Sequence, residues 1–145
     1  MILEQLHKMI TNKEYAEATT YMEENTAAIF ANDKLDLIYK EINQEEFLSQ
    51  ASDLVLLITA WCAFFNKDNE MVTKVLKRLE GKNFMSVYDT SSYAALYAVT
   101  AENLSQEERV FYATKAMQAL PQGDTSAYMV NAKLVYEQIT GKDQK

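Results

Sequence analysis

Side chains that could catalyse a reaction or bind a metal ion are scarce in this sequence. His7 and Cys62 are the sole histidine and cysteine among its 145 residues. A zinc site needs several such ligands, and a serine or cysteine nucleophile needs a histidine base, so neither kind of site is expected. The Gly-Lys pairs at 81–82 and 141–142 lack the first glycine and the hydroxyl of a phosphate-binding loop. The sequence therefore predicts no catalytic residues, no metal and no cofactor.

The acidic residues include three adjacent pairs, Glu23-Glu24, Glu45-Glu46 and Glu107-Glu108. On a helix, neighbouring side chains point about 100° apart, which is typical of solvated carboxylates rather than of a catalytic dyad. The net charge of −7 also repels phosphate backbones. We expect that the chain is not an enzyme and that it makes no direct contact with nucleic acid.

Aromatic and methionine side chains are the groups that could bind a ligand or a partner. The chain has nine tyrosines and seven methionines, types that serve both cores and adaptable binding surfaces. Tyr93 and Tyr97 share one face of an expected helix. Two interpretations stay open: ordinary packing between helices, or a concave surface on which helical repeats bind ligands or peptides.

A second candidate surface lies on the last expected helix. Met129, Lys133 and Tyr136 share a face opposite the apolar stripe that contains Ala132 and Val135. This face is either covered by a further repeat in a longer protein or is plain surface. In the first case the isolated chain should self-associate through it.

The composition indicates that helices position these residues. The three glycines and one proline make up about 3% of the residues, against roughly 12% in an average protein. An all-β fold needs more of these turn residues. A lone cysteine permits no internal disulfide and fits a reducing compartment. No apolar run reaches the roughly 18 residues that a membrane span requires. We therefore expect an all-α, cytoplasmic protein.

Apolar residues recur at helical spacing and predict eight helices separated by short polar breaks. The expected helices cover residues 2–10, 15–29, 35–42, 53–65, 71–79, 93–102, 105–120 and about 128–139. The helix over 53–65 is apolar on nearly every side, which predicts burial on all faces and places Trp61 in the core.

Local signals mark the ends of several helices. Ser105 and Glu108 form a capping box, and Gly81 suits a left-handed C-terminal cap. Asp124 or Thr125 is expected to cap the last helix. The segment 83–92 is interpreted as either a loop or a single turn.

Recurring hairpins predict a helical repeat, with an irregular single bundle as the alternative. The breaks at 12–14 and 66–68 both follow an apolar helix and precede an amphipathic one. Residues 116–121 end in a proline, like the close of a tetratricopeptide unit. Ala94, Ala98 and Ala101 form a stripe that lets a neighbouring helix approach closely. The predicted fold is therefore all-α, with antiparallel helical hairpins stacked as a tetratricopeptide-like α-α superhelix.

The order of these motifs resembles the helical-repeat region of the MalT-like regulators of the LuxR family. The resemblance rests on residues 15–18, 35–39, 54–61, 65–68 and 116–124. It implies that residues 1–145 are a single helical-repeat domain, a fragment of a bacterial, ATP-dependent transcriptional regulator.

In such a regulator, the segment senses a small-molecule inducer or binds a protein partner. It thereby gates the ATPase and DNA-binding modules, and adjacent repeats of the parent protein are its further partners. The rival prediction is a stand-alone tetratricopeptide-like adaptor that binds a peptide or protein. A small helical-bundle enzyme is a third, remote alternative for which no catalytic residues can be named.

Overall fold

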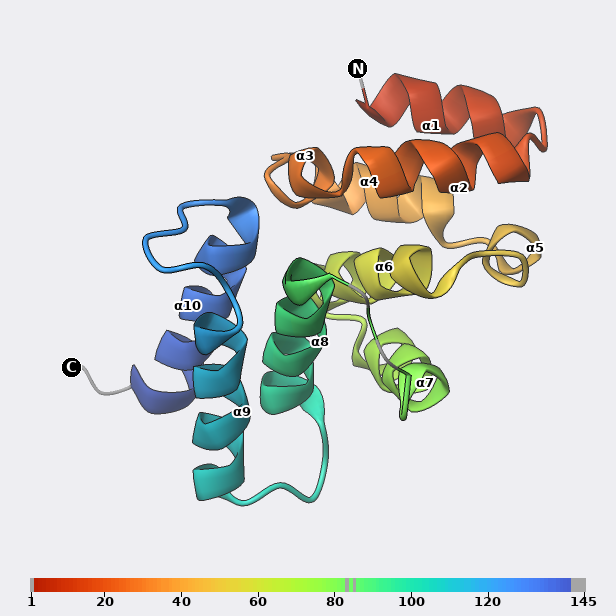
Figure 1. Cartoon of the computed structure of the whole chain (residues 1–145). Helices are drawn as coiled ribbons and strands as arrows, with labels where there is room; N and C mark the ends of the chain where they lie inside the picture. The colour runs from red at the N-terminus through yellow and green to blue at the C-terminus, as the bar shows by residue number, and fades with distance from the viewer. Residues whose placement is uncertain (1, 83, 85, 142–145) are drawn as a thin grey trace. The chain divides into compact units, whose positions relative to one another are not determined.

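A computed structural model describes residues 2–82, 84 and 86–141. These residues form ten helices and no strand, so the prediction of an all-α protein is confirmed (Figure 1). Within the same residues, no helix is both long enough and apolar enough to cross a membrane. The chain divides into two compact units, unit 1 (Met1–Leu79) and unit 2 (Glu80–Lys145). The prediction of one helical-repeat domain stays a prediction.

Unit 1 is built around one central helix. Its helices are α1 (Ile2–Thr11), α2 (Tyr15–Glu24), α3 (Thr26–Phe30), α4 (Leu35–Ile42), α5 (Glu45–Leu48), α6 (Asp53–Phe65) and α7 (Asn69–Leu79). Helices α2, α3, α4 and α7 all pack against α6, and α1 packs against α2 and α4. This arrangement surrounds α6, and it explains why that helix tolerates apolar residues on every side.

The burial of α6 confirms the prediction for residues 53–65. Ser52 caps its N-terminus by accepting a hydrogen bond from the backbone N–H of Val55, and residues 55–63 are all buried. The fully buried Trp61 ring lies 6.1 Å from the ring of Phe30 and 5.7 Å from that of Phe65, measured between centroids. Aromatic contacts of this kind stabilise a core beyond the area that they bury.

The breaks at 12–14 and 66–68, which were predicted to correspond, have the same backbone geometry. Lys13 and Lys67 adopt left-handed conformations, with φ of 59° and 62°. The backbone N–H of the next residue, Glu14 or Asp68, donates a 2.8 Å hydrogen bond to the carbonyl five residues earlier, that of Met9 or Ala63. This bond is the signature of a Schellman motif, which ends a helix by satisfying its last carbonyls.

Asp68 in the second break holds two elements together. Its Oδ1 accepts a hydrogen bond from the backbone N–H of Met71 at the start of α7, at 3.3 Å. Its Oδ2 accepts a 2.6 Å hydrogen bond from the Tyr39 hydroxyl on α4. Burial and this carboxylate both raise the pKa of Tyr39 well above its ordinary value.

Two predictions for unit 1 need correction. The single helix expected over 15–29 is divided at Asn25, whose side chain donates to the carbonyl of Tyr21 at 2.8 Å. The Thr26 hydroxyl bonds the carbonyl of Met22, so both polar side chains compete with the helix backbone where it turns. Residues 43–52, which were expected to connect the helices over 35–42 and 53–65, contain the short helix α5, whose Phe47 is fully buried.

Unit 2 contains three helices that pack against one another in all pairs (Figure 1). They are α8 (Val87–Thr100), α9 (Gln106–Gln118) and α10 (Ala127–Thr140). Most of the described residues that are buried in this unit are small, namely Ser91, Ser92, Ala95, Ala98, Ala113, Ala116 and Ala132. The buried Ser91 hydroxyl donates a 2.7 Å hydrogen bond to the carbonyl of Ala116 and so joins α8 to α9.

The small-residue stripe of α8 differs from the predicted one. Ser91, Ala95 and Ala98 are the buried residues at this spacing, whereas Ala94 is half-buried and Ala101 lies just beyond the helix end. The predicted stripe was wrong because the helix was expected to begin at residue 93, whereas α8 begins at Val87. The first two turns of α8 contain Ser91, which a search for alanines at helical spacing does not find.

The helix ends of unit 2 were predicted with mixed success. The Ser105–Glu108 capping box is present, and Gly81 has the left-handed φ of +81° that was expected. Helix α8 begins at Val87 because Ser86 accepts a hydrogen bond from the N–H of Tyr88 at 3.0 Å. Of the uncertain segment 83–92, residues 83 and 85 lie outside the described residues.

The cap predicted for α10 was wrong. Ser126, rather than Asp124 or Thr125, is the residue at the N-cap position. The Asp124 carboxylate instead accepts hydrogen bonds from the Ser126 hydroxyl at 2.5 Å and from its backbone N–H at 3.3 Å. Asp124 therefore stabilises the turn that leads into the helix.

Candidate binding site

Tyr93 and Tyr97 of α8 lie next to each other and meet a third tyrosine from α9. The rings of Tyr93 and Tyr97 are nearly parallel, with centroids 6.0 Å apart and an angle of 15° between their planes. Tyr112 packs edge-on against Tyr97, at 5.1 Å and 85°. These three rings, here called the aromatic corner, thus comprise two nearly parallel rings and a third at about a right angle to Tyr97.

The aromatic corner encloses an open hollow of about 290 Å³. Small side chains leave room for it, because Ala94 stands between the two tyrosines of α8. The residues that line the hollow are Glu80, Thr90, Tyr93, Ala94, Tyr97, Tyr112 and Lys115. All of them belong to unit 2, so the hollow is formed within one compact unit.

Further aromatic side chains extend the aromatic corner on both sides. Phe84 packs on Tyr93 with a centroid distance of 5.8 Å, and Phe111 packs on Tyr112 at 5.3 Å. Phe111 is 55% exposed, which is unusual for so large an apolar side chain. The ammonium nitrogen of Lys115 lies 5.4 Å above the centre of the Phe111 ring, the geometry of a cation–π contact.

The electrostatics of the hollow are set by oxygen atoms. Burial raises the pKa of the Tyr93 hydroxyl above its ordinary value of 10.0. Repulsion from Tyr97, Glu80 and Tyr112, which line the same hollow, raises it further. The hydroxyl of Tyr93 consequently stays protonated at neutral pH.

The second predicted surface is not part of this hollow. On α10, Met129 and Tyr136 are half-buried and Lys133 is exposed. The large apolar side chains of this helix that are most exposed are Val130, at 61%, and Leu134, at 41%. The structure therefore brings Tyr93 and Tyr97 together with Tyr112, and leaves the α10 candidates on a separate part of unit 2.

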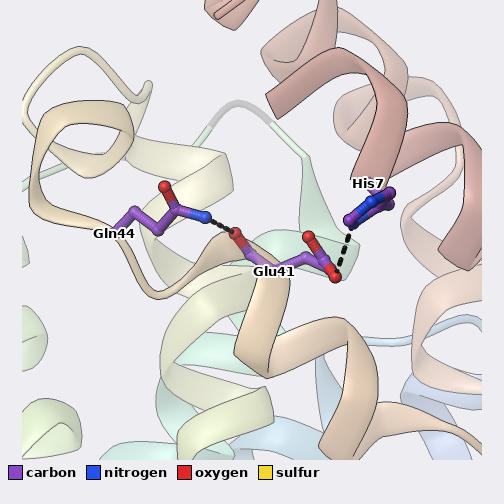
Figure 2. A network of polar contacts seen from close by, with 3 residues as sticks. All are labelled: His7, Glu41 and Gln44. Atoms are coloured by element: carbon purple, nitrogen blue, oxygen red, sulfur yellow. Dashed lines mark hydrogen bonds and ion pairs between the residues drawn. The ribbon is translucent and has the colours of Figure 1, made fainter. Parts of the chain in front are cut away.

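The two residues with possible catalytic chemistry both belong to unit 1. Figure 2 shows His7 of α1 beside Glu41 of α4, with Nδ1 and Oε2 2.9 Å apart, and Gln44 donating to the Glu41 carbonyl. Cys62 is fully buried in α6, and burial raises its pKa to about 12, so its thiol is unreactive at neutral pH. In the described ranges, no three His, Cys, Asp or Glu side chains gather where they could hold a metal ion.

Comparison of the chain with protein-family models, with curated proteins and with solved structures finds no match. The resemblance to the MalT-like regulators therefore stays a prediction.

Proposed function

We propose that the chain is a binding module rather than an enzyme, and that the aromatic corner is its binding surface. The observation that supports this is the placement of three half-buried tyrosines around an open hollow, with a fourth aromatic ring, that of Phe111, exposed beside them. Rings that only served packing would gain more free energy by full burial. A hollow walled by rings and bordered by a few polar groups is the usual form of a ligand site.

We also propose that the helical hairpins stack as a tetratricopeptide-like superhelix. In unit 2, α8 packs against both its hairpin partner α9 and the next helix, α10, as neighbouring repeats do. The shared Schellman geometry at Lys13 and Lys67 supports a repeated unit in unit 1. Stacked hairpins present a continuous surface, which suits ligand or peptide binding.

The cellular role that we propose is that of the sensor segment of a MalT-like, LuxR-family transcriptional regulator in the bacterial cytoplasm. The order of the motifs over residues 15–124 supports it. In this role a small-molecule inducer or a protein partner binds the segment and gates ATPase and DNA-binding modules. Adjacent repeats of the parent protein would cover the exposed apolar residues of α10.

The size of the native polypeptide tests this role against the adaptor role. An immunoblot of source cells, with an antibody raised against residues 1–145, should give a band several times heavier than 16.6 kDa. A band at 16.6 kDa would contradict the regulator and leave the stand-alone adaptor as the better proposal.

A thermal-shift screen with a small-molecule library tests the binding surface. Compounds that raise the melting temperature of the wild-type chain should lose this effect in Tyr97→Ala. Compounds whose effect survives in Tyr97→Ala, but is lost in Met129→Ala, would move the binding surface to α10.

A further inference from the structure

The orientation of the rings in the aromatic corner favours a compact ligand over a flat one. The ring planes of Tyr93 and Tyr97 are 15° apart, whereas Tyr112 stands at 85° to Tyr97. A flat ligand can lie parallel to only one of these two ring orientations, but a compact group can contact rings of both orientations at once. The faces of aromatic rings carry the negative part of the ring quadrupole, so the compact group they attract best is a cation.

One acidic side chain at the hollow has the charge that a cation needs. Glu80 contributes a carboxylate to the lining, beside Tyr93, Tyr97 and Tyr112. The whole chain carries a net charge of −7, which adds a field of the same sign. Neither the Glu80 carboxylate nor this net charge attracts an anionic ligand.

Lys115 is the one cationic side chain that lines the hollow. Its ammonium nitrogen lies over Phe111, at 5.4 Å from the ring centre, and Phe111 is outside the aromatic corner. Lys115 therefore shows that an ammonium group packs on an aromatic ring beside the aromatic corner. Its charge also opposes a second cation nearby, which makes its removal a useful test.

We propose that the aromatic corner binds a small alkylated ammonium ion, with the rings of Tyr93, Tyr97 and Tyr112 around the charged head. Glu80 at the rim provides the counter-charge. A hollow of about 290 Å³ has room for a trimethylammonium group with a short substituent. This inference rests on the proposed function, because it names the ligand class of the same binding surface.

Two ligands that differ only in charge provide the experiment. Choline and its neutral carbon analogue, 3,3-dimethyl-1-butanol, are titrated into the full chain and followed by calorimetry or NMR. We expect choline to bind about tenfold more tightly, which corresponds to about 1.4 kcal/mol and lies within the range of a cation–π site. Equal affinities, or no saturable binding of choline, would overturn the proposal.

Variants separate the contributions of the rings and the charges. Tyr97→Leu keeps an apolar side chain but removes the ring, and should weaken choline binding about tenfold while changing the neutral analogue little. Glu80→Gln should weaken choline a few-fold, and Lys115→Gln should strengthen it. Tyr136→Leu on α10 is the matched control and should change nothing.

Glu80 and Lys115 are both exposed, so their variants stay informative even if Tyr97→Leu does not fold. Choline affinity that is unchanged in both charge variants would contradict the proposal. Its failure would be distinct from failure of the proposed function, which the immunoblot and the thermal-shift screen decide without choline.

Discussion

In unit 1 the large side chains are buried, whereas in unit 2 the core is made of small ones and the large aromatic rings lie near the surface. Among the largest fully buried side chains of the described residues, Leu96 alone belongs to unit 2. Unit 1 buries Trp61, Phe47 and many leucines and isoleucines. Most of the residues that unit 2 buries are alanines and serines, and Tyr93 and Tyr112 are half-buried.

The difference indicates a division of roles. Hydrophobic stabilisation grows with the apolar area that is buried, so unit 1 gains more from its core than unit 2 does. Small residues let the helices of unit 2 approach closely, and the large rings then remain available at the edges of the bundle. We propose that stability depends mainly on unit 1 and ligand binding on unit 2, and the following predictions test that proposal.

The largest effect is expected from Trp61→Ala in unit 1. Removing a fully buried indole leaves a cavity in the centre of the core and should lower the free energy of unfolding by about 3–5 kcal/mol. A denaturant titration followed by circular dichroism measures the change. Tyr97→Ala, in the aromatic corner, is the contrasting variant and should lower stability much less; similar losses in both variants would contradict the division of roles.

Alkaline pH should destabilise unit 1 through Cys62. The unfolded thiol loses its proton above pH 9.0, whereas the folded one keeps it until about pH 12. Between these values the native state binds more protons than the unfolded state. The contribution of Cys62 to the free energy of unfolding is therefore fully present below pH 9.0 and falls as pH rises, by up to about 1.4 kcal/mol per pH unit. Urea titrations from pH 8 upwards, in reductant, should give a shallower decline for Cys62→Ala. An equally steep decline in both proteins would count against this cause.

Overpacking should disturb the small-residue core of unit 2. Ala116 is fully buried where α9 meets α8, and Ala116→Leu should lower the free energy of unfolding by about 1–3 kcal/mol because the helices must separate. Ala94→Leu is the matched control, since Ala94 lines the open hollow and its replacement fills empty space. The control should keep its stability and lose choline binding. Equal destabilisation would mean that the hollow is part of the core.

The smallest effect is expected at a helix break. Lys67 has a φ of 62°, which is strained for a residue with a Cβ, so Lys67→Gly should raise the free energy of unfolding by about 0.5–1 kcal/mol. Lys74→Gly, within α7, makes the same replacement at a helical position and should lower it by about 1 kcal/mol. Changes of the same sign in the two variants would show that backbone strain is not the cause.

Much of the fold could be predicted because the decisive signals are local. The bounds of α6 follow from a continuous apolar segment, and the start of α9 follows from Ser105 and Glu108. The errors at Asn25 and at the start of α10 share a cause, since several polar residues in a row could each have ended or capped the helix. Tertiary packing decides among them, and single residues do not encode it.

The candidate site was predictable only in part, for the same reason. Tyr93 and Tyr97 are four residues apart, so helical spacing alone places them together. Tyr112 joins them because Ser91 and Ala116 bring α8 close to α9, and that approach depends on residues far apart in sequence. Glu80 precedes α8 in the chain, and no spacing rule connects it with the tyrosines.

The position of Trp61 has a consequence for spectroscopy. It is the sole tryptophan of the chain and is buried in unit 1, whereas six of the nine tyrosines belong to unit 2. Light of a wavelength that only tryptophan absorbs therefore excites unit 1 alone, and its emission reports the polarity around α6. Tyrosine emission is weighted towards unit 2. Tryptophan emission thus reports the unfolding of unit 1 alone, whereas tyrosine emission reports mainly that of unit 2.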